Sequence, residues 1–114
     1  MTDTPAPPKR PKRPHQVYTL IVEVGRKPGD GLPAKATGAA LMIYSSGVSE
    51  DEAVREAVAV LKQADMAPLD VQGYGTAEDR ARDGPPVAEW EPPLMARALA
   101  ENAVIVAEVT PFDD

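Results

Sequence analysis

A capped amphipathic helix near the middle of the chain separates the strand-like segments into two groups. Ser49 and Glu52 have the spacing of a capping box, in which the two side chains satisfy free N–H groups at the start of a helix. The two residues between them are acidic and suit the positive end of the helix dipole. Apolar residues then recur at helical spacing until Pro68, which cannot continue a helix. The sequence therefore predicts a helix that ends at about Met66.

Four other segments have the composition of β-strands, because they are rich in β-branched residues or alternate in polarity and are bounded by turn residues. They are Val17–Val24, about Thr37–Ser45, Leu69–Tyr74 and Ala103–Thr110. Val87–Trp90 predicts a short fifth strand. Pro92 and Pro93 suit the first turn of a second helix, which ends near Asn102. Gly25–Lys35 and Gly75–Pro86 are predicted loops.

This order of segments predicts an α+β fold. We expect a two-layer sandwich, in which two helices lie on one face of a four- or five-stranded, mainly antiparallel sheet. If Val87–Trp90 is counted as a strand, the plan is ferredoxin-like with an added N-terminal strand at Val17–Val24. A doubly wound parallel sheet is the alternative.

The chain changes in composition at about residue 16. Residues 1–16 hold five of the 13 prolines and a net charge of +3, whereas residues 17–114 carry eight basic and 17 acidic side chains, a net charge of −9. We expect a disordered tail over residues 1–16 and a single α+β domain over 17–114. The acidic domain disfavours nucleic acid as a partner, apart from weak contacts of the basic run at residues 9–13.

The chain has few of the side chains on which most small enzymes rely. It contains no cysteine, and its one histidine, His15, lies in the predicted tail. No phosphate-binding G-K-[ST] triplet occurs, and the acidic residues of 78–83 lack the spacing of a calcium loop. We therefore expect no enzymatic activity, cofactor or metal. The absence of cysteine, of a secretory signal and of a long apolar run favours a cytoplasmic location.

The two-residue period of a strand predicts an apolar outer face on the sheet. In the first and last strands, one set of alternate residues is fully apolar and belongs under the helices. The other set contains glutamates yet keeps large apolar residues, and we expect it to face outward. The predicted interaction face consists of Val17, Ile21, Glu23, Val104, Val106 and Glu108.

Water is a poor environment for such a face, so the leading hypothesis is a protein-interaction or self-association module without enzymatic activity. A second copy of the chain and a basic protein are the expected partners. The alternative is a small-ligand sensor that uses the loops 25–36 and 75–90. A third hypothesis makes Glu23 and Glu108 an acid–base pair, which requires the two strands to be neighbours. The remaining alternative is that a helix or loop of the chain covers the face.

Overall fold

A computed structural model describes residues 14–112 of the chain. Its elements, in chain order, are β1 (Gln16–Val24), β2 (Gly38–Gly47), α1 (Glu50–Gln63), β3 (Pro68–Gly73), α2 (Ala77–Asp83), α3 (Glu91–Glu101) and β4 (Val104–Phe112). The first 13 residues of the predicted tail lie outside the described range. His15 and Gln16 lie inside it, and β1 already begins at Gln16.

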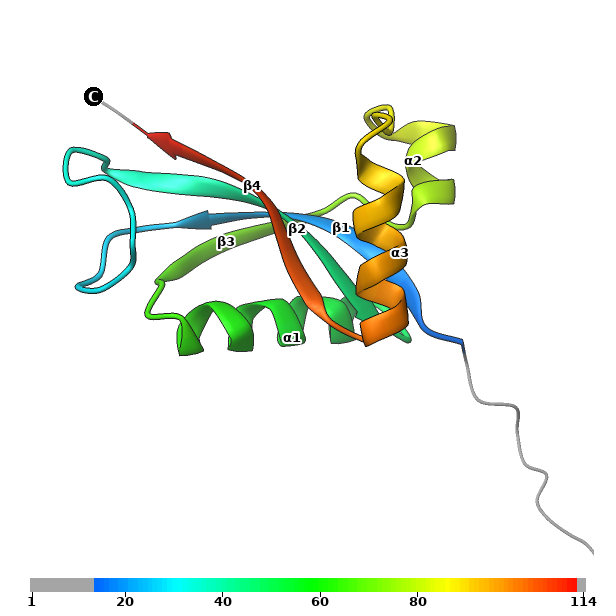
Figure 1. The fold of residues 1–114 in the computed structure, drawn as a ribbon, viewed down its shortest axis with the longest axis horizontal. Coiled ribbons are helices and arrows are strands. Elements are labelled where there is room, and N and C mark those ends of the chain that lie inside the picture. Colours follow the sequence, from blue (N-terminus) through cyan, green and yellow to red (C-terminus); the bar gives the residue numbers. More distant parts are fainter. Residues whose placement is uncertain (1–13, 113–114) are drawn as a thin grey trace, which may run out of the picture.

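The four strands form one antiparallel sheet in the order β3-β1-β2-β4 (Figure 1). The hairpin of β1 and β2 occupies the centre, and the later strands β3 and β4 form the two edges. This arrangement confirms the predicted α+β class and the antiparallel sheet, with four strands. The parallel alternative is therefore wrong.

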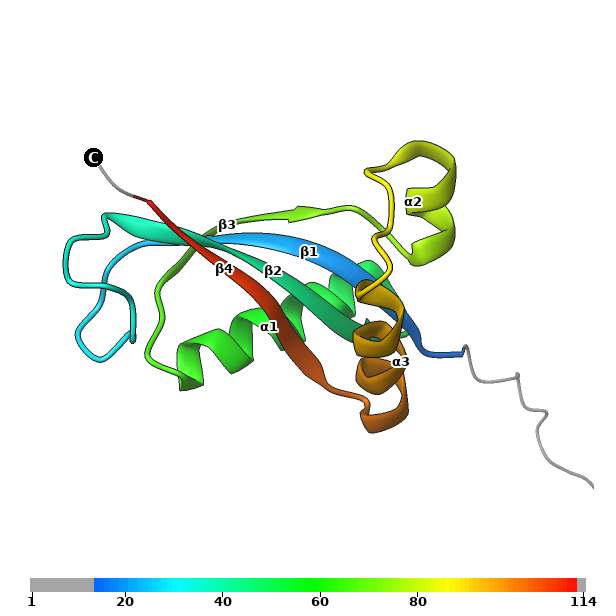
Figure 2. The same ribbon diagram turned by 45° about the horizontal axis from the view of Figure 1, so that its top comes forward.

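Helix α1 covers one face of the sheet along the length of β1 and β2 (Figure 2). Half of the predicted capping box is present, because the Ser49 hydroxyl accepts the Glu52 N–H at 3.2 Å. The Glu52 carboxylate accepts the N–H of Val48, at 2.9 Å, rather than that of Ser49. The main core lies between this helix and the sheet. It contains Leu20, Val22, Val24, Ala39, Leu41, Ile43, Ala57 and Leu61. Burying each of its large side chains stabilises the fold by about 1.5–3 kcal/mol.

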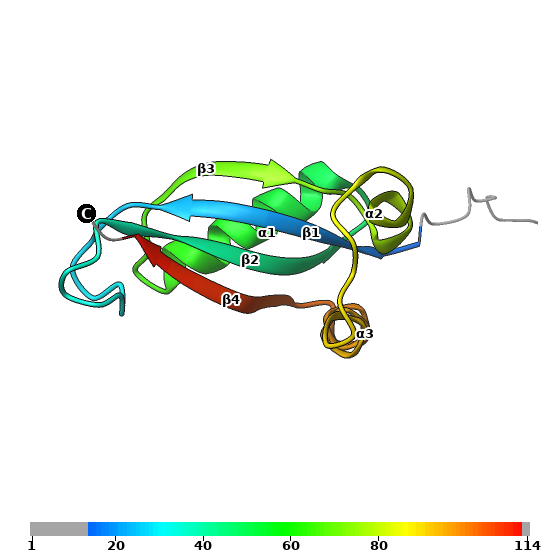
Figure 3. The ribbon, with the colours of Figure 1, turned by 90° about the horizontal axis from the view of Figure 1, so that it is seen from above.

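Helix α3 packs at one end of the sheet, against side chains that point to the face opposite α1. Its Met95 and Ala98 form a second buried cluster with Tyr44, whereas the neighbouring Ile43 belongs to the core under α1. Figure 3 shows α1 behind the sheet, with α2 and α3 grouped at the end where β1 begins. The helices therefore do not all lie on one face, and within residues 14–112 they cover the side opposite α1 at that end only.

The segment between β3 and α3 differs from its predicted structure. Residues 77–83 form the short helix α2 rather than a loop, because Thr76 and Asp79 make a reciprocal capping box. Val87–Trp90 are not a strand, because this segment turns directly into α3. The Glu91 carboxylate fixes that turn by accepting the Ala88 N–H at 2.7 Å. The fifth strand of the ferredoxin-like plan is therefore absent from residues 14–112.

Candidate interaction face and its supporting network

The side of the sheet opposite α1 carries two rows of side chains that cross all four strands. Residues directly opposite one another on paired strands share a face, so the registers of the sheet define these rows. We call this surface the open face. It consists of Gln72–Ile21–Met42–Glu108 and Asp70–Glu23–Ala40–Thr110.

The open face has an apolar centre with acidic side chains around it. The side chains of Ile21, Ala40 and Met42 are half-buried, whereas the carboxylates of Glu23, Asp70 and Glu108 are exposed. Neither row contains a lysine or arginine. Within residues 14–112, none of the three carboxylates has an ion-pair partner. The face therefore presents negative charge around a small apolar area.

Glu23 and Asp70 are directly opposed on β1 and β3. Their Cβ atoms are about 4.5–5.5 Å apart in such a pair, and like charges in this position destabilise the sheet. Sequence analysis missed Asp70, because nothing in the sequence revealed that β3 pairs with β1 on the side away from β2. A cation placed over this pair would relieve the repulsion.

The expectation that Val104 and Val106 share the face of Glu108 is wrong. The register between β2 and β4 shifts between Met42 and Ile43, where β4 contains one extra residue. This β-bulge reverses the alternation of the strand. Val104 packs against the core under α1, and Val106 is opposite the buried Ile43. Both side chains therefore belong to the α1 side of the sheet.

Val17 lies on the predicted side of the sheet but outside the open face. It is half-buried and packs against the cluster of Tyr44, Met95 and Ala98. Of the six predicted interaction residues, Ile21, Glu23 and Glu108 are thus brought together on the uncovered surface. Of the four apolar residues of the predicted face, only Ile21 lies on the open face, so its apolar area is smaller than the sequence predicts.

The strand order separates Glu23 from Glu108. Because β2 lies between β1 and β4, the two residues sit on strands about 10 Å apart, twice the usual strand spacing. Glu23 is opposite Ala40 and Glu108 is opposite Met42, so they also occupy different rows. This geometry does not support an acid–base pair, which requires the carboxyl groups to interact directly.

A buried polar network holds α2 and α3 over the end of the sheet where β1 begins, on the same side as the open face. The Arg80 guanidinium forms a double hydrogen bond with the Glu91 carboxylate at 2.6 and 3.1 Å, and both side chains are nearly inaccessible to solvent. The Tyr44 hydroxyl donates to the same carboxylate at 2.5 Å. Arg80 also donates to the Thr19 hydroxyl and to the carbonyl oxygens of Pro85 and Pro86.

This network is complete within itself. The five N–H groups of Arg80 have five acceptors, and the Glu91 carboxylate accepts from Arg80, Tyr44 and the Ala88 N–H. Burial raises the pKa of Glu91, but the hydrogen bonds from Arg80, Tyr44 and Ala88 outweigh this effect and lower it to about 2. Burial and the hydrogen bond to Glu91 raise the pKa of Tyr44. The network therefore holds α2 and α3 on the sheet, and Arg80 has no free N–H donor for a ligand.

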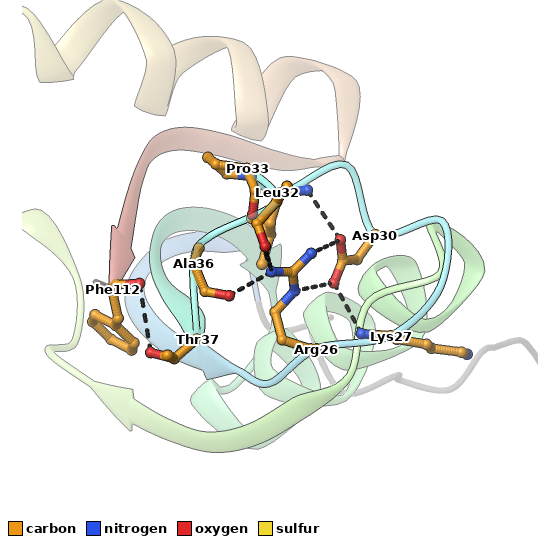
Figure 4. A network of polar contacts seen from close by, with 9 residues as sticks. Arg26, Lys27, Asp30, Leu32, Pro33, Ala36, Thr37 and Phe112 are labelled. Atoms are coloured by element: carbon orange, nitrogen blue, oxygen red, sulfur yellow. Dashed lines mark hydrogen bonds and ion pairs between the residues drawn. The ribbon is translucent and has the colours of Figure 1, made fainter. Parts of the chain in front are cut away.

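The loop between β1 and β2 is closed by its own arginine (Figure 4). The Arg26 guanidinium donates to the Asp30 carboxylate at 3.0 Å and to the carbonyl oxygens of Pro33 and Ala36. Asp30 in turn accepts the backbone N–H groups of Leu32 and Lys27. These two bonds, followed by the one from Arg26, lower the pKa of Asp30 to about 2. Arg26 is thus engaged inside the loop rather than available to an anion.

The two loops of the ligand-sensor alternative do not meet. The loop after β1 follows Val24, whereas the segment that begins at Gly75 pairs with Thr19, toward the other end of the same strand. Figure 1 shows them at opposite ends of the sheet. The later segment borders an open depression of about 450 Å³, whose lining includes Tyr18, Glu50, Tyr74, Asp79 and Asp83. Glu50 there accepts the Gly75 N–H at 3.1 Å, so its carboxylate already supports the turn.

No cluster of three or more acidic or histidine side chains suited to a metal ion occurs within residues 14–112. In the same range, no helix combines the length and the apolar character that crossing a membrane requires.

Comparison with known proteins assigns a family without an activity. The profile of a family described as a domain of unknown function matches residues 17–113, which is most of the chain. No curated protein and no solved structure matches it. The function therefore has to be argued from the chemistry of the site.

Proposed function

The chain belongs to the family described as a domain of unknown function, DUF8846, and we propose that it is a protein-interaction module that docks a basic partner on its open face. The observation that carries this proposal is the composition of the face. Carboxylates from three strands surround Ile21 and Met42, and no basic side chain accompanies them. A complementary surface would place lysine or arginine residues around an apolar centre.

The charge of the face favours a different protein over a second copy of the chain as the partner. Two open faces brought together would bury six carboxylates against one another, and like charges in an interface cost several kcal/mol. The whole domain strengthens this preference, because residues 17–114 carry a net charge of −9. Attraction of a basic partner would also accelerate the encounter and weaken as salt is added.

The competing explanation is that the carboxylates protect the sheet from aggregation. Asp70 and Glu108 lie on the edge strands β3 and β4, where charged side chains hinder pairing with other chains. A charge reversal separates the two explanations, because lysine also protects an edge but repels a basic partner. The double variant Glu23→Lys with Glu108→Lys should therefore remain folded and free of aggregation while it loses partner binding.

Photo-crosslinking in lysate of the native host tests the proposal directly. A benzophenone amino acid replaces Gln72, which is exposed on the open face, and in a matched control replaces Arg55, which is exposed on α1. We expect a discrete adduct with a basic protein from position 72 only, reduced at least tenfold by the double lysine variant and by added salt. Equal adducts from both positions, or an adduct insensitive to the charge reversal, would contradict docking on this face.

A further inference from the structure

An apolar groove lies between α2 and α3, on the side of the sheet opposite α1 and at the end where β1 begins (Figure 3). Its volume is about 300 Å³. The lining is mostly apolar and includes Val17, Ala77, Met95, Ala96 and Leu99. None of these residues belongs to the rows of the open face, so the groove is a separate surface.

Leu99 shows that the groove is incompletely filled. Met95 packs against Tyr44 and is only 8% exposed, whereas Leu99 is 46% exposed. The two residues are four positions apart on α3 and therefore lie on the same side of the helix. Full burial of a leucine side chain is worth about 1.5–3 kcal/mol, so covering Leu99 would recover part of this amount. An apolar occupant is favoured.

The chain enters the described range at the edge of this groove. His15 and Gln16, which directly precede Val17, are themselves lining residues. The residues before them are therefore attached at the groove, and such attachment gives an effective concentration of about millimolar for docking there. Pro8 precedes His15 by seven residues. At the polyproline rise of about 3.1 Å per residue these span up to about 22 Å, which lets the chain turn back.

The segment Pro5–Pro8 matches the groove in polarity. It reads Pro-Ala-Pro-Pro and has no charged side chain. Its three prolines have no backbone N–H, so burial against an apolar surface leaves a single N–H donor to satisfy. The prolines also restrict the undocked segment, which lowers the conformational entropy that docking costs. Few segments lose so little on entering an apolar groove.

The charges on the two sides agree with this placement. Residues 9–13, which would connect the docked segment to β1, carry four basic side chains, and residues 17–114 carry a net charge of −9. Glu78 lines the groove, is exposed and makes no ion pair within residues 14–112. We propose that Pro5–Pro8 of the chain's own N-terminal segment dock in this groove.

A spin label next to the segment tests the proposal. The chain has no cysteine, so Thr4→Cys gives the ¹⁵N-labelled full chain a single nitroxide at position 4. Relative to the reduced label, we expect the amide signals of Ala77 and Leu99 to lose more than about half of their intensity, because the attached segment is docked for most of the time. The signal of Arg55, which is exposed on α1, should keep its intensity.

Three variants of the labelled chain separate docking in the groove from general attraction to the domain. Replacing Pro5, Pro7 and Pro8 with serine keeps the length and charge of the segment, and it should restore the intensity at Ala77. Leu99→Gln makes the groove more polar and should have the same effect. Leu69→Gln, the matched change at an exposed leucine of β3, should leave the intensity loss unchanged. The amide spectrum of each variant shows whether it is folded.

Several results would overturn the proposal. Unaltered intensity at Ala77 and Leu99, or a uniform loss over the whole domain, would show that the segment does not dock in the groove. An equal loss in the serine variant would show that its prolines are not the bound residues. In a mixture of spin-labelled chains without ¹⁵N and ¹⁵N chains without the label, an equal loss would place the segment on a second copy.

Discussion

At the scale of single residues, the Arg80–Glu91 pair is the feature on which the covered end of the sheet most depends. Both charges are buried, and each is fully hydrogen-bonded by the other and by Tyr44, Thr19 and nearby backbone groups. Such a pair adds little to the free energy of unfolding compared with two well-packed apolar residues in its place. Removing only one partner is costly, because it leaves a buried charge without a counter-ion. The pair therefore makes the position of α2 and α3 sensitive to one substitution.

The first prediction concerns this pair. Glu91→Gln should lower the free energy of unfolding by about 3–5 kcal/mol at neutral pH, because Arg80 keeps its charge and loses its counter-ion. Urea unfolding followed by circular dichroism measures the change. The matched control Glu89→Gln, two residues away and exposed, should change it by less than about 0.5 kcal/mol. Similar small effects in both variants would show that the pair does not hold the segment.

The second prediction is a dependence of stability on pH. The pKa of Glu91 falls from its ordinary value of 4.5 to about 2 in the folded chain. Because the pKa is lowered in the folded chain, the ionised Glu91 carboxylate stabilises the fold fully at pH values above 4.5. This stabilisation is lost as the pH falls from about 4.5 toward 2. Urea unfolding at pH 7, 4.5 and 3 should therefore show a steeper loss in the wild type than in Glu91→Gln. Asp30 contributes in the same direction to both proteins, since its pKa is also lowered. Parallel curves would rule out the linkage to Glu91.

The sequence contains no local signal for this network. Arg80 lies among acidic neighbours in a polar segment, which is the pattern of a solvated surface helix. Its side-chain partners are Glu91 of α3 and Thr19 of β1, and Tyr44 of β2 joins the network through Glu91. Its burial follows from tertiary packing, and no periodicity or motif in the sequence reports that packing.

At the scale of elements, the strands and the two longer helices were predictable because their signals are local. The Ser49 cap of α1, the β-branched residues of β1 and the prolines in the first turn of α3 each specify their element within a few residues. Two features depend on contacts across the sheet and were missed. One is the order of the strands, and the other is the extra residue in β4 that moves Val104 and Val106 to the α1 side. For that reason Val104 and Val106 lie on the α1 side, whereas Glu108 of the same strand lies on the open face with Ile21 and Glu23 of β1.

The third prediction concerns the close approach of β2 to β1. A Cβ atom added to Gly38 would lie 2.5 Å from the Val24 carbonyl oxygen, which is backbone and cannot move alone. Gly38→Ala should therefore destabilise the chain by about 1–3 kcal/mol. At Gly25 the added atom would meet only the exposed side chain of Leu69, at 3.2 Å. Gly25→Ala should therefore destabilise the chain clearly less than Gly38→Ala. Thermal unfolding of the two variants measures the difference. Equal costs would indicate that the strands adjust freely at Gly38.

At the scale of the whole molecule, charge is distributed so that the uncovered part of the sheet repels its own copy. Residues 17–114 carry a net charge of −9, and the open face holds three of their carboxylates and no basic residue. Apolar contact between two such faces competes with this repulsion, and the apolar area available is limited to the half-buried centre of the face.

The fourth prediction follows from that balance. Analytical ultracentrifugation at micromolar concentration and low salt should give a monomer. The triple variant Glu23→Gln, Asp70→Asn and Glu108→Gln keeps the shape of the face but removes its charge, and it should self-associate more strongly. A stable wild-type dimer whose affinity is the same in the triple variant would contradict the role assigned to the carboxylates.

The strand order also has a consequence for synthesis of the chain. The two central strands are adjacent in sequence and are joined by a loop that Arg26 and Asp30 close with local bonds. As the nascent chain leaves the ribosome, this hairpin and α1 emerge together, well before the final strand. Short loops close at a smaller entropic cost than long ones. The edge beside β2 therefore stays unpaired until β4 has left the ribosome, and a pause in translation before that point would prolong its exposure to chaperones.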